Sequence, residues 1–107
     1  MVTIPCEVME TIQNFLDLLK PEIHIEKVIL FGSYAKGTHN ESSDIDLAII
    51  SPDFKQDKCI EDMTFLLCTA NKLKADIQTI PFSLAEYEEP VGLLEEILRT
   101  GVELEAA

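Results

Sequence analysis

The segment DIDLAII, from Asp44 to Ile50, restricts the possible fold more than any other part of the sequence. Side chains alternate along a strand, so Asp44 and Asp46 point to the same face, with their Cα atoms roughly 6.6 Å apart. The isoleucine and leucine side chains that alternate with them point to the opposite face. We therefore expect a sheet with one face packed on helices and the other face polar where this strand begins.

Periodic patterns predict the other elements and their order. The predicted elements are helices over residues 4–19, 57–74 and 90–99 and strands over residues 26–31, 44–50 and 76–80. Pro81 is expected to close the third strand, and a polar loop over residues 37–43 separates the first two strands. Ser83, followed three residues later by Glu86, predicts a capped helix start. Residues 102–106 form either a short strand or a tail.

Apolar residues of the long second helix and the cysteines are expected inside the protein. The apolar face predicted for that helix is made by Ile60, Met63, Leu67, Ala70 and Leu73. Cys6, Cys59 and Cys68 show no spacing typical of a metal site. We expect all three to be reduced and mostly buried as small apolar residues.

The length and charge of the chain limit its class and its partners. Its 107 residues suit a single domain, residues 1–107. No apolar run approaches the ~20 residues of a membrane helix, and the N-terminus lacks the basic region of a signal peptide, so an intracellular, cytoplasmic protein is the simplest expectation. The net charge of −12 repels a phosphate backbone, which makes nucleic acid an unlikely partner. A bound polyphosphate would need a divalent metal ion to supply positive charge.

Asp76 begins the third predicted strand and is a candidate third member of the acidic group. If that strand lies beside DIDLAII with Asp76 on the same face, three carboxylates converge. Two unit charges ~4 Å apart repel by about 4 kcal/mol at an effective dielectric constant near 20, and a divalent cation reverses the sign of that energy. Mg²⁺ is typically held by one or two carboxylates together with substrate phosphates, which favours phosphoryl chemistry with one or two metal ions. The alternative is that Asp44 and Asp46 are solvated residues where a strand starts.

Gly32 and Ser33 follow the first predicted strand and form the second notable feature. A glycine there permits close approach of the backbone, and the N–H groups that follow can bind an anion. The Ser33 hydroxyl can donate to a phosphate oxygen, and Gly37 would let the chain turn back. The pattern is neither the P-loop G-x-x-x-x-G-K-[ST] nor the dinucleotide fingerprint. The alternative here is an ordinary turn from a strand to a helix.

The run L-F-G-S-x-A-x-G, a polar loop and then S-D-I-D-L are together far more specific than each part. From about Val28 to Ile80 the sequence resembles a minimal nucleotidyltransferase (MNT-type) of the DNA polymerase β superfamily. The ending ILRTGVELEA is also similar to the C-terminus of that family. The resemblance implies an α/β (α+β) fold of the polymerase-β-like nucleotidyltransferase type, a small mixed sheet with helices packed on one face.

The resemblance also assigns nucleotide-binding residues. Gly32 and Ser33 match the pair that grips the terminal phosphates of the nucleotide. Lys36 stands where many relatives have arginine. A lysine there still supplies a point charge to phosphate, but it lacks the bidentate fork of arginine.

The acidic residues match the catalytic set of the family. Asp44 and Asp46 correspond to the metal ligands. Asp76 corresponds to the third carboxylate, which helps to hold the catalytic metal and assists deprotonation of the acceptor hydroxyl.

The activity implied by the resemblance is transfer of AMP from ATP, with one or two Mg²⁺ ions, to an acceptor hydroxyl. Minimal members of this kind are commonly encoded with a small helical partner of the HEPN type and act as its antitoxin, and in some pairs the antitoxin adenylylates a tyrosine of the toxin. The expected partners are therefore a nucleoside triphosphate and such a helical protein, with a homo-oligomer left open. The alternatives are a non-catalytic module that neutralises a helical partner by contact, and nucleotidyl transfer to a small molecule or an RNA end.

Overall fold

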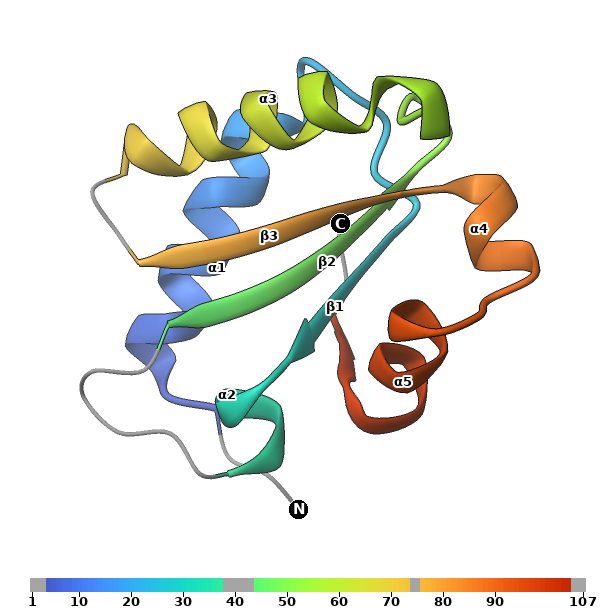
Figure 1. Ribbon diagram of the computed structural model, residues 1–107. Helices are drawn as coiled ribbons and strands as arrows, with labels where there is room; N and C mark the ends of the chain where they lie inside the picture. The colour runs from blue at the N-terminus through green and yellow to red at the C-terminus, as the bar shows by residue number, and fades with distance from the viewer. Residues whose placement is uncertain (1–3, 38–43, 74–75, 105–107) are drawn as a thin grey trace.

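The structure is a computed structural model that describes residues 4–37, 44–73 and 76–104 (Figure 1). Its helices are α1 (Cys6–Leu19), α2 (Ser33–Lys36), α3 (Cys59–Asn71), α4 (Leu84–Glu88) and α5 (Leu93–Thr100), with a 3-10 turn η1 at Gln56–Lys58. Its strands are β1 (Lys27–Phe31), β2 (Ile45–Ser51), β3 (Ile77–Ser83) and β4 (Val102–Leu104). The predicted polar loop lies outside the described residues, apart from Gly37. No helix in the described part of the chain is long and apolar enough to cross a membrane.

The strands form one mixed sheet in the order β3-β2-β1-β4. β1 pairs antiparallel with both β2 and β4, whereas β2 pairs parallel with β3. A parallel pair needs a crossover connection, and α3 provides it between β2 and β3. The starts of β2 and β3 therefore lie at the same end of the sheet, and β1 finishes at that end too.

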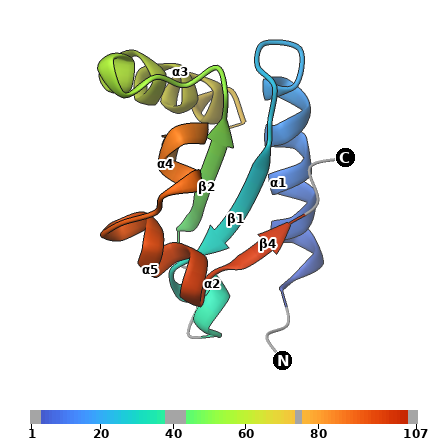
Figure 2. The ribbon, with the colours of Figure 1, turned by 90° about the vertical axis from the view of Figure 1, so that its right-hand side faces the viewer.

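Helices cover both faces of the sheet, but unequally. On the face expected to carry helices, Leu47 and Ile49 of β2 are buried in one core with Phe15 of α1 and with residues of α3. The second face has a smaller core that joins β2 to α5 through Ile50 and Ile97. Figure 2 shows α1 on one side of the sheet and α5 on the other. The smaller core does not reach the start of β2, which leaves that end of the second face open to ligands.

β3 runs past Pro81, where the sequence predicted its end. The Ile45 N–H donates to the Asp76 carbonyl at 2.8 Å, which sets the hydrogen-bond phase of the parallel pair. In that phase the backbone N–H and C=O groups of Gln78 and Ile80 point to β2. The backbone nitrogen of Pro81 points to the free side of the edge strand. The missing N–H therefore removes no hydrogen bond between β3 and β2, and the strand continues to Ser83.

Two helices, α4 and α5, follow β3 in the structure. Ser83 caps α4 as expected, since its Oγ accepts a hydrogen bond from the Glu86 N–H at 3.2 Å. The chain then leaves the helix and passes through Pro90 and Gly92, and α5 begins only at Leu93. Gly92 has a φ of +63°, which no right-handed helix accommodates. The prediction that Pro90 starts the last helix is therefore wrong.

The buried face of α3 differs from the predicted one. Leu66 and Ala70 are buried in the main core, whereas Ile60, Met63 and Leu67 are 81%, 45% and 57% exposed. The helix carries apolar residues on two adjacent faces, and a periodic pattern alone does not select between them. Packing on the sheet and on α1 selects the face that contains Leu66.

The three cysteines are free, as predicted, but they are exposed rather than buried. Cys59 and Cys68 lie on α3, on the part of its surface that packing leaves outside. Cys6 is the first residue of α1. The expectation that they act as small core residues is therefore wrong.

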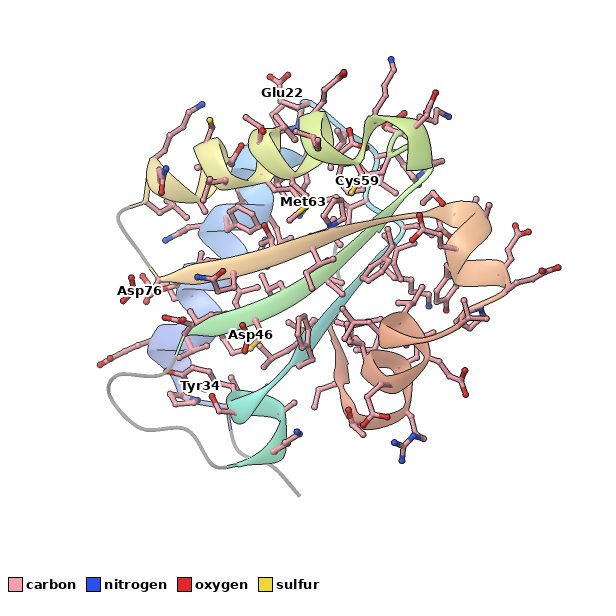
Figure 3. The ribbon with its side chains drawn as sticks, in the orientation of Figure 1. Glu22, Tyr34, Asp46, Cys59, Met63 and Asp76 are labelled. Atoms are coloured by element: carbon pink, nitrogen blue, oxygen red, sulfur yellow. The ribbon has the colours of Figure 1, made fainter. Side chains whose placement is uncertain are left out.

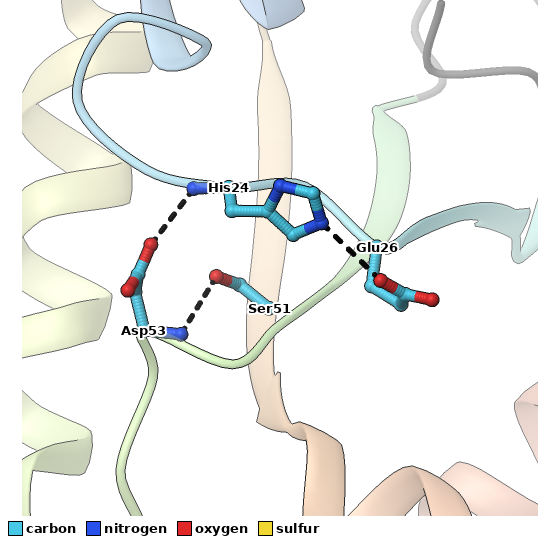
Figure 4. A network of polar contacts seen from close by, with 4 residues as sticks. All are labelled: His24, Glu26, Ser51 and Asp53. Atoms are coloured by element: carbon cyan, nitrogen blue, oxygen red, sulfur yellow. Dashed lines mark hydrogen bonds and ion pairs between the residues drawn. The ribbon is translucent and has the colours of Figure 1, made fainter.

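A polar network joins two loops at the end of the sheet opposite to the start of β2 (Figure 4). The His24 N–H donates to Asp53 Oδ2 at 2.8 Å, and the Asp53 N–H donates to Oγ of Ser51 at 3.0 Å. His24 Nε2 also lies 3.3 Å from Glu26 Oε2. The network connects the segment between α1 and β1 with the turn that follows β2.

Replacing Asp53 with alanine is expected to lower the free energy of unfolding by about 1 kcal/mol, because a backbone donor loses its acceptor. Glu26→Ala is the matched control, since Glu26 lies beside the exposed ring of the same histidine. It is expected to change the free energy by less than about 0.5 kcal/mol. Urea unfolding measures both values, and equal losses would contradict a specific role for the backbone hydrogen bond.

Candidate active site

The glycine-serine turn and the acidic pair meet where β1 ends and β2 begins. Phe31, the last residue of β1, pairs with Asp46 of β2. Gly32 follows with a φ of +76°, and a Cβ added to it would lie 2.1 Å from Asp46 Oδ2. The Asp46 carboxylate therefore lies directly against the backbone of Gly32, and a Cβ at residue 32 would overlap its Oδ2.

The residues after Gly32 form the short helix α2. Ser33, its first residue, is partly buried, and Lys36, its last, is exposed. The helix is anchored by buried Tyr34, which belongs to the main core. Gly37 ends it with a φ of +76° in the left-handed region. The anchored turn places Ser33 immediately after the Gly32 backbone that Asp46 contacts.

Asp44 and Asp46 lie on the same face where β2 starts, as the alternation predicts. Asp44 is exposed and Asp46 is partly buried. Burial raises the pKa of Asp46, and the nearby charge of Asp44 raises it further. Burial and the charge of Asp44 both disfavour the state in which the two carboxylates are charged together. A bound cation would offset both effects.

Asp76 lies at the same end of the sheet but outside the acidic pair. It immediately precedes β3, its carbonyl accepts the N–H of Ile45 at 2.8 Å, and it is exposed. Figure 3 shows Asp76 and Asp46 at this end, on neighbouring strands. In the described ranges, no three His, Cys, Asp or Glu side chains are gathered closely enough to hold a metal ion.

Gln78 is a residue of this site that the sequence reasoning did not single out. It pairs with Asp46 in the parallel ladder, and it is exposed. Paired residues of neighbouring strands project to the same face, so the Gln78 amide lies on the face of the acidic pair. Counting two residues on from Asp76 would have identified it, because side chains alternate along a strand.

The residues present fit a magnesium ion held together with a nucleotide. Asp44 and Asp46 supply hard anionic oxygens, and Mg²⁺ commonly takes one or two carboxylates while substrate phosphates supply further ligands. Burial and the charge of Asp44 raise the pKa of Asp46, and a positive charge beside this carboxylate would favour its ionised form. A cation between the carboxylates and the phosphates would supply that charge.

Comparison with known proteins agrees with this arrangement. The family model described as "Polymerase beta, Nucleotidyltransferase" matches residues 10–105. The protein named "Putative protein adenylyltransferase MJ0604", from Methanocaldococcus jannaschii, is 43% identical over 68 residues, which span 61% of this chain and 61% of that protein. "Putative protein adenylyltransferase MJ0141", from the same organism, is 31% identical over 107 residues and covers 92% of this chain and 99% of its own length.

Two solved structures are similar in fold. One, described as a "putative nucleotidyltransferase" from Sulfolobus solfataricus, has a TM-score of 0.68 at 16% identity, over 91% of this chain and 78% of that chain. The other is a chain in the crystal structure of a toxin-antitoxin with AMP-PNP, with a TM-score of 0.57 at 25% identity, over 89% and 73%. The family match extends over most of the sequence and a 31% identical relative aligns along nearly its whole length, so the chain belongs to the polymerase beta nucleotidyltransferase family.

Proposed function

We propose that this nucleotidyltransferase transfers AMP from ATP to a hydroxyl group of a partner protein, a tyrosine of a helical toxin of the HEPN type. The observation that carries the proposal is the contact between Gly32 and the Asp46 carboxylate, which joins the phosphate-binding turn to the acidic pair. The names of the two archaeal relatives support a protein acceptor. The similar chain in a toxin-antitoxin with AMP-PNP supports both an adenine nucleotide and a toxin partner.

The nucleotide side of the site would act through the turn after β1. The backbone N–H groups at Gly32 and Ser33 and the Ser33 hydroxyl would bind the terminal phosphates. Lys36, exposed at the end of α2, would add a positive charge near them. Asp44 and Asp46 would hold Mg²⁺, and the ion would neutralise the charge that develops on the phosphates.

The transfer step exchanges one bond to the α-phosphorus for another. The acceptor oxygen attacks that phosphorus, its bond to the oxygen that bridges to the β-phosphorus breaks, and pyrophosphate leaves with the electron pair. We assign the acceptor proton to the Asp76 carboxylate, which is exposed at the same sheet end. Its exposed position suits contact with an incoming hydroxyl, and the same carboxylate would help to hold the metal ion.

The proposal is tested with ATP labelled at the α-phosphate, Mg²⁺ and the purified product of the adjacent gene. Label is expected on the partner protein, and EDTA or the Asp44→Asn substitution is expected to remove it. ATP labelled at the γ-phosphate should leave the partner unlabelled, because pyrophosphate departs. Tight binding of the partner without transfer would contradict the proposal in favour of a non-catalytic module. Label on RNA ends or small molecules alone would contradict the proposed acceptor.

A further inference from the structure

α3 presents a row of apolar side chains to solvent. Cys59, Met63 and Leu67 are spaced four residues apart, which aligns them along the helix. Cys59 is exposed, Met63 and Leu67 are 45% and 57% exposed, and Ile60 beside them is 81% exposed. We refer to these four residues as the α3 ridge. Single exposed apolar residues are ordinary, but a continuous apolar patch marks a surface that contacts another molecule.

The α3 ridge lies beside the free edge of the sheet. α3 packs on β3, which is an edge strand. Figure 3 shows Cys59 and Met63 projecting from α3 on the side that faces β3. The α3 ridge therefore lies on one side of this surface, and the end of β3 and α4 lie on the other side.

A groove continues this surface from the Cys59 end of the ridge. A hollow of about 370 Å³ lies between α3 and α4, and its lining includes Cys59, Asp62, Phe82 and Glu86. A second hollow of about 360 Å³ shares Phe82 and Glu86 and extends to Val91, which is 77% exposed. The two hollows share these two lining residues and therefore adjoin each other, and we refer to them together as the groove.

The groove carries negative charge. Its lining includes the carboxylates of Asp62, Glu86 and Glu89, against one lysine, Lys55, among the described lining residues. A molecule that covers the groove would remove these carboxylates from water, which is unfavourable unless positive groups meet them. The surface therefore favours an occupant that is both apolar and basic.

We propose that the α3 ridge and the groove together bind an amphipathic helix of a partner protein, with its apolar face on the ridge and its Lys and Arg residues at the groove. A row of residues four apart packs between the equivalent rows of another helix. A strand fits less well, because Pro81 offers no N–H on the free edge of β3. A second copy fits less well because each chain has a net charge of −12 and its acidic groove would meet another acidic surface.

The position of the ridge connects this surface with the candidate active site. α3 ends at Asn71 and β3 begins at Ile77, so the C-terminal end of α3 lies toward the sheet end that carries Asp44 and Asp76 (Figure 1). A helix that covers the ridge would extend toward that end and bring a hydroxyl near its terminus to the site. This last step rests on the proposed function, whereas the docking surface itself does not.

The test uses a fluorescent amphipathic peptide of roughly 18 residues, long enough for a helix on a surface, with leucines at helical spacing and lysines elsewhere. Its dissociation constant is measured by anisotropy at physiological salt. The double variant Met63→Ser/Leu67→Ser is expected to weaken binding at least about tenfold. The control Met9→Ser/Leu18→Ser changes two apolar residues of α1 that are each 38% exposed, and it should bind within about twofold of the native chain. A peptide with glutamate in place of lysine should bind at least about tenfold more weakly.

Two outcomes would overturn the proposal. One is an equal effect, or no effect, of the ridge and control variants on peptide binding. The other is a dimer of the native chain in sedimentation that the ridge variant loses, since the occupant would then be a second copy. Asp44→Asn is expected to bind the peptide as the native chain does. If the peptide binds as described but the native chain transfers no AMP, the docking surface stands and the proposed function fails.

Discussion

Replacing Gly32 with alanine is expected to reduce AMP transfer at least about 10²-fold, as a displacement of about 1 Å in a catalytic group does. The added Cβ would lie 2.1 Å from Asp46 Oδ2, so the carboxylate has to leave its place. The backbone of Gly32, with φ 76° and ψ −149°, lies in a region that is essentially restricted to glycine, which adds strain of about 1–3 kcal/mol for a residue with a Cβ. Transfer of labelled AMP and urea unfolding measure the two effects separately.

Gly37→Ala is the control that adds a Cβ at a positive φ without the contact, at a ψ of 14° in the left-handed region, whereas the ψ of Gly32 is −149°. Gly37 also has a φ of +76°, but a Cβ added there meets no atom within 4 Å. It is therefore expected to lower the free energy of unfolding by about 1–2 kcal/mol and to keep most of the activity. Equal losses of activity in the two variants would show that strain in the turn, and not the position of Asp46, limits the reaction.

Replacing Asp46 with asparagine is expected to change activity and stability in opposite directions. Transfer should fall at least about 10³-fold, because the site loses an anionic ligand for Mg²⁺. The free energy of unfolding at neutral pH should rise, because the folded chain disfavours the charged form of Asp46. The raised pKa of this carboxyl, caused first by burial and then by Asp44, means that the folded chain binds the proton more tightly than the unfolded chain does. The resulting destabilisation is complete above the folded pKa and disappears as the pH falls to the unfolded value.

The control for Asp46→Asn is Asp57→Asn, which removes one negative charge from the exposed turn η1. It should keep both activity and stability. Thermal unfolding with Mg²⁺ and AMP-PNP adds a second readout, since a ligand that binds only the folded chain raises the midpoint temperature. The native chain and Asp57→Asn should show that rise, and Asp46→Asn should not. A fall in stability of Asp46→Asn would contradict the repulsion inferred at the acidic pair.

The parts of the fold that were predictable are those with a strong local pattern. The strand that begins after Asp44 and the cap at Ser83 follow from alternation and from side-chain hydrogen bonding, and the structure contains both. The extent of β3 was not predictable, because Pro81 ends a strand or continues it according to which side the next strand lies on. The buried face of α3 depended in the same way on neighbours that periodicity does not describe.

The shared face of the acidic pair was predictable from the sequence, whereas Gln78 was missed and the distances within the candidate site were not predictable. Asp44 and Asp46 share a face because side chains alternate along a single strand. The contact between Gly32 and Asp46 depends on the register of β1 against β2, which pairs Phe31 with Asp46. The position of Asp76 relative to the acidic pair depends on the parallel register of β3 against β2. The contact and the position of Asp76 both depend on how separate segments pair in space, so the structure was needed to obtain them.

The shared space between Gly32 and Asp46 also limits how this chain evolves. A Cβ gained at residue 32 would lie 2.1 Å from Asp46 Oδ2, and a shorter residue at position 46 would relieve that overlap. The compensating change removes the group on which the proposed reaction depends. A side chain at residue 32 is therefore expected to be selected against while the activity is under selection.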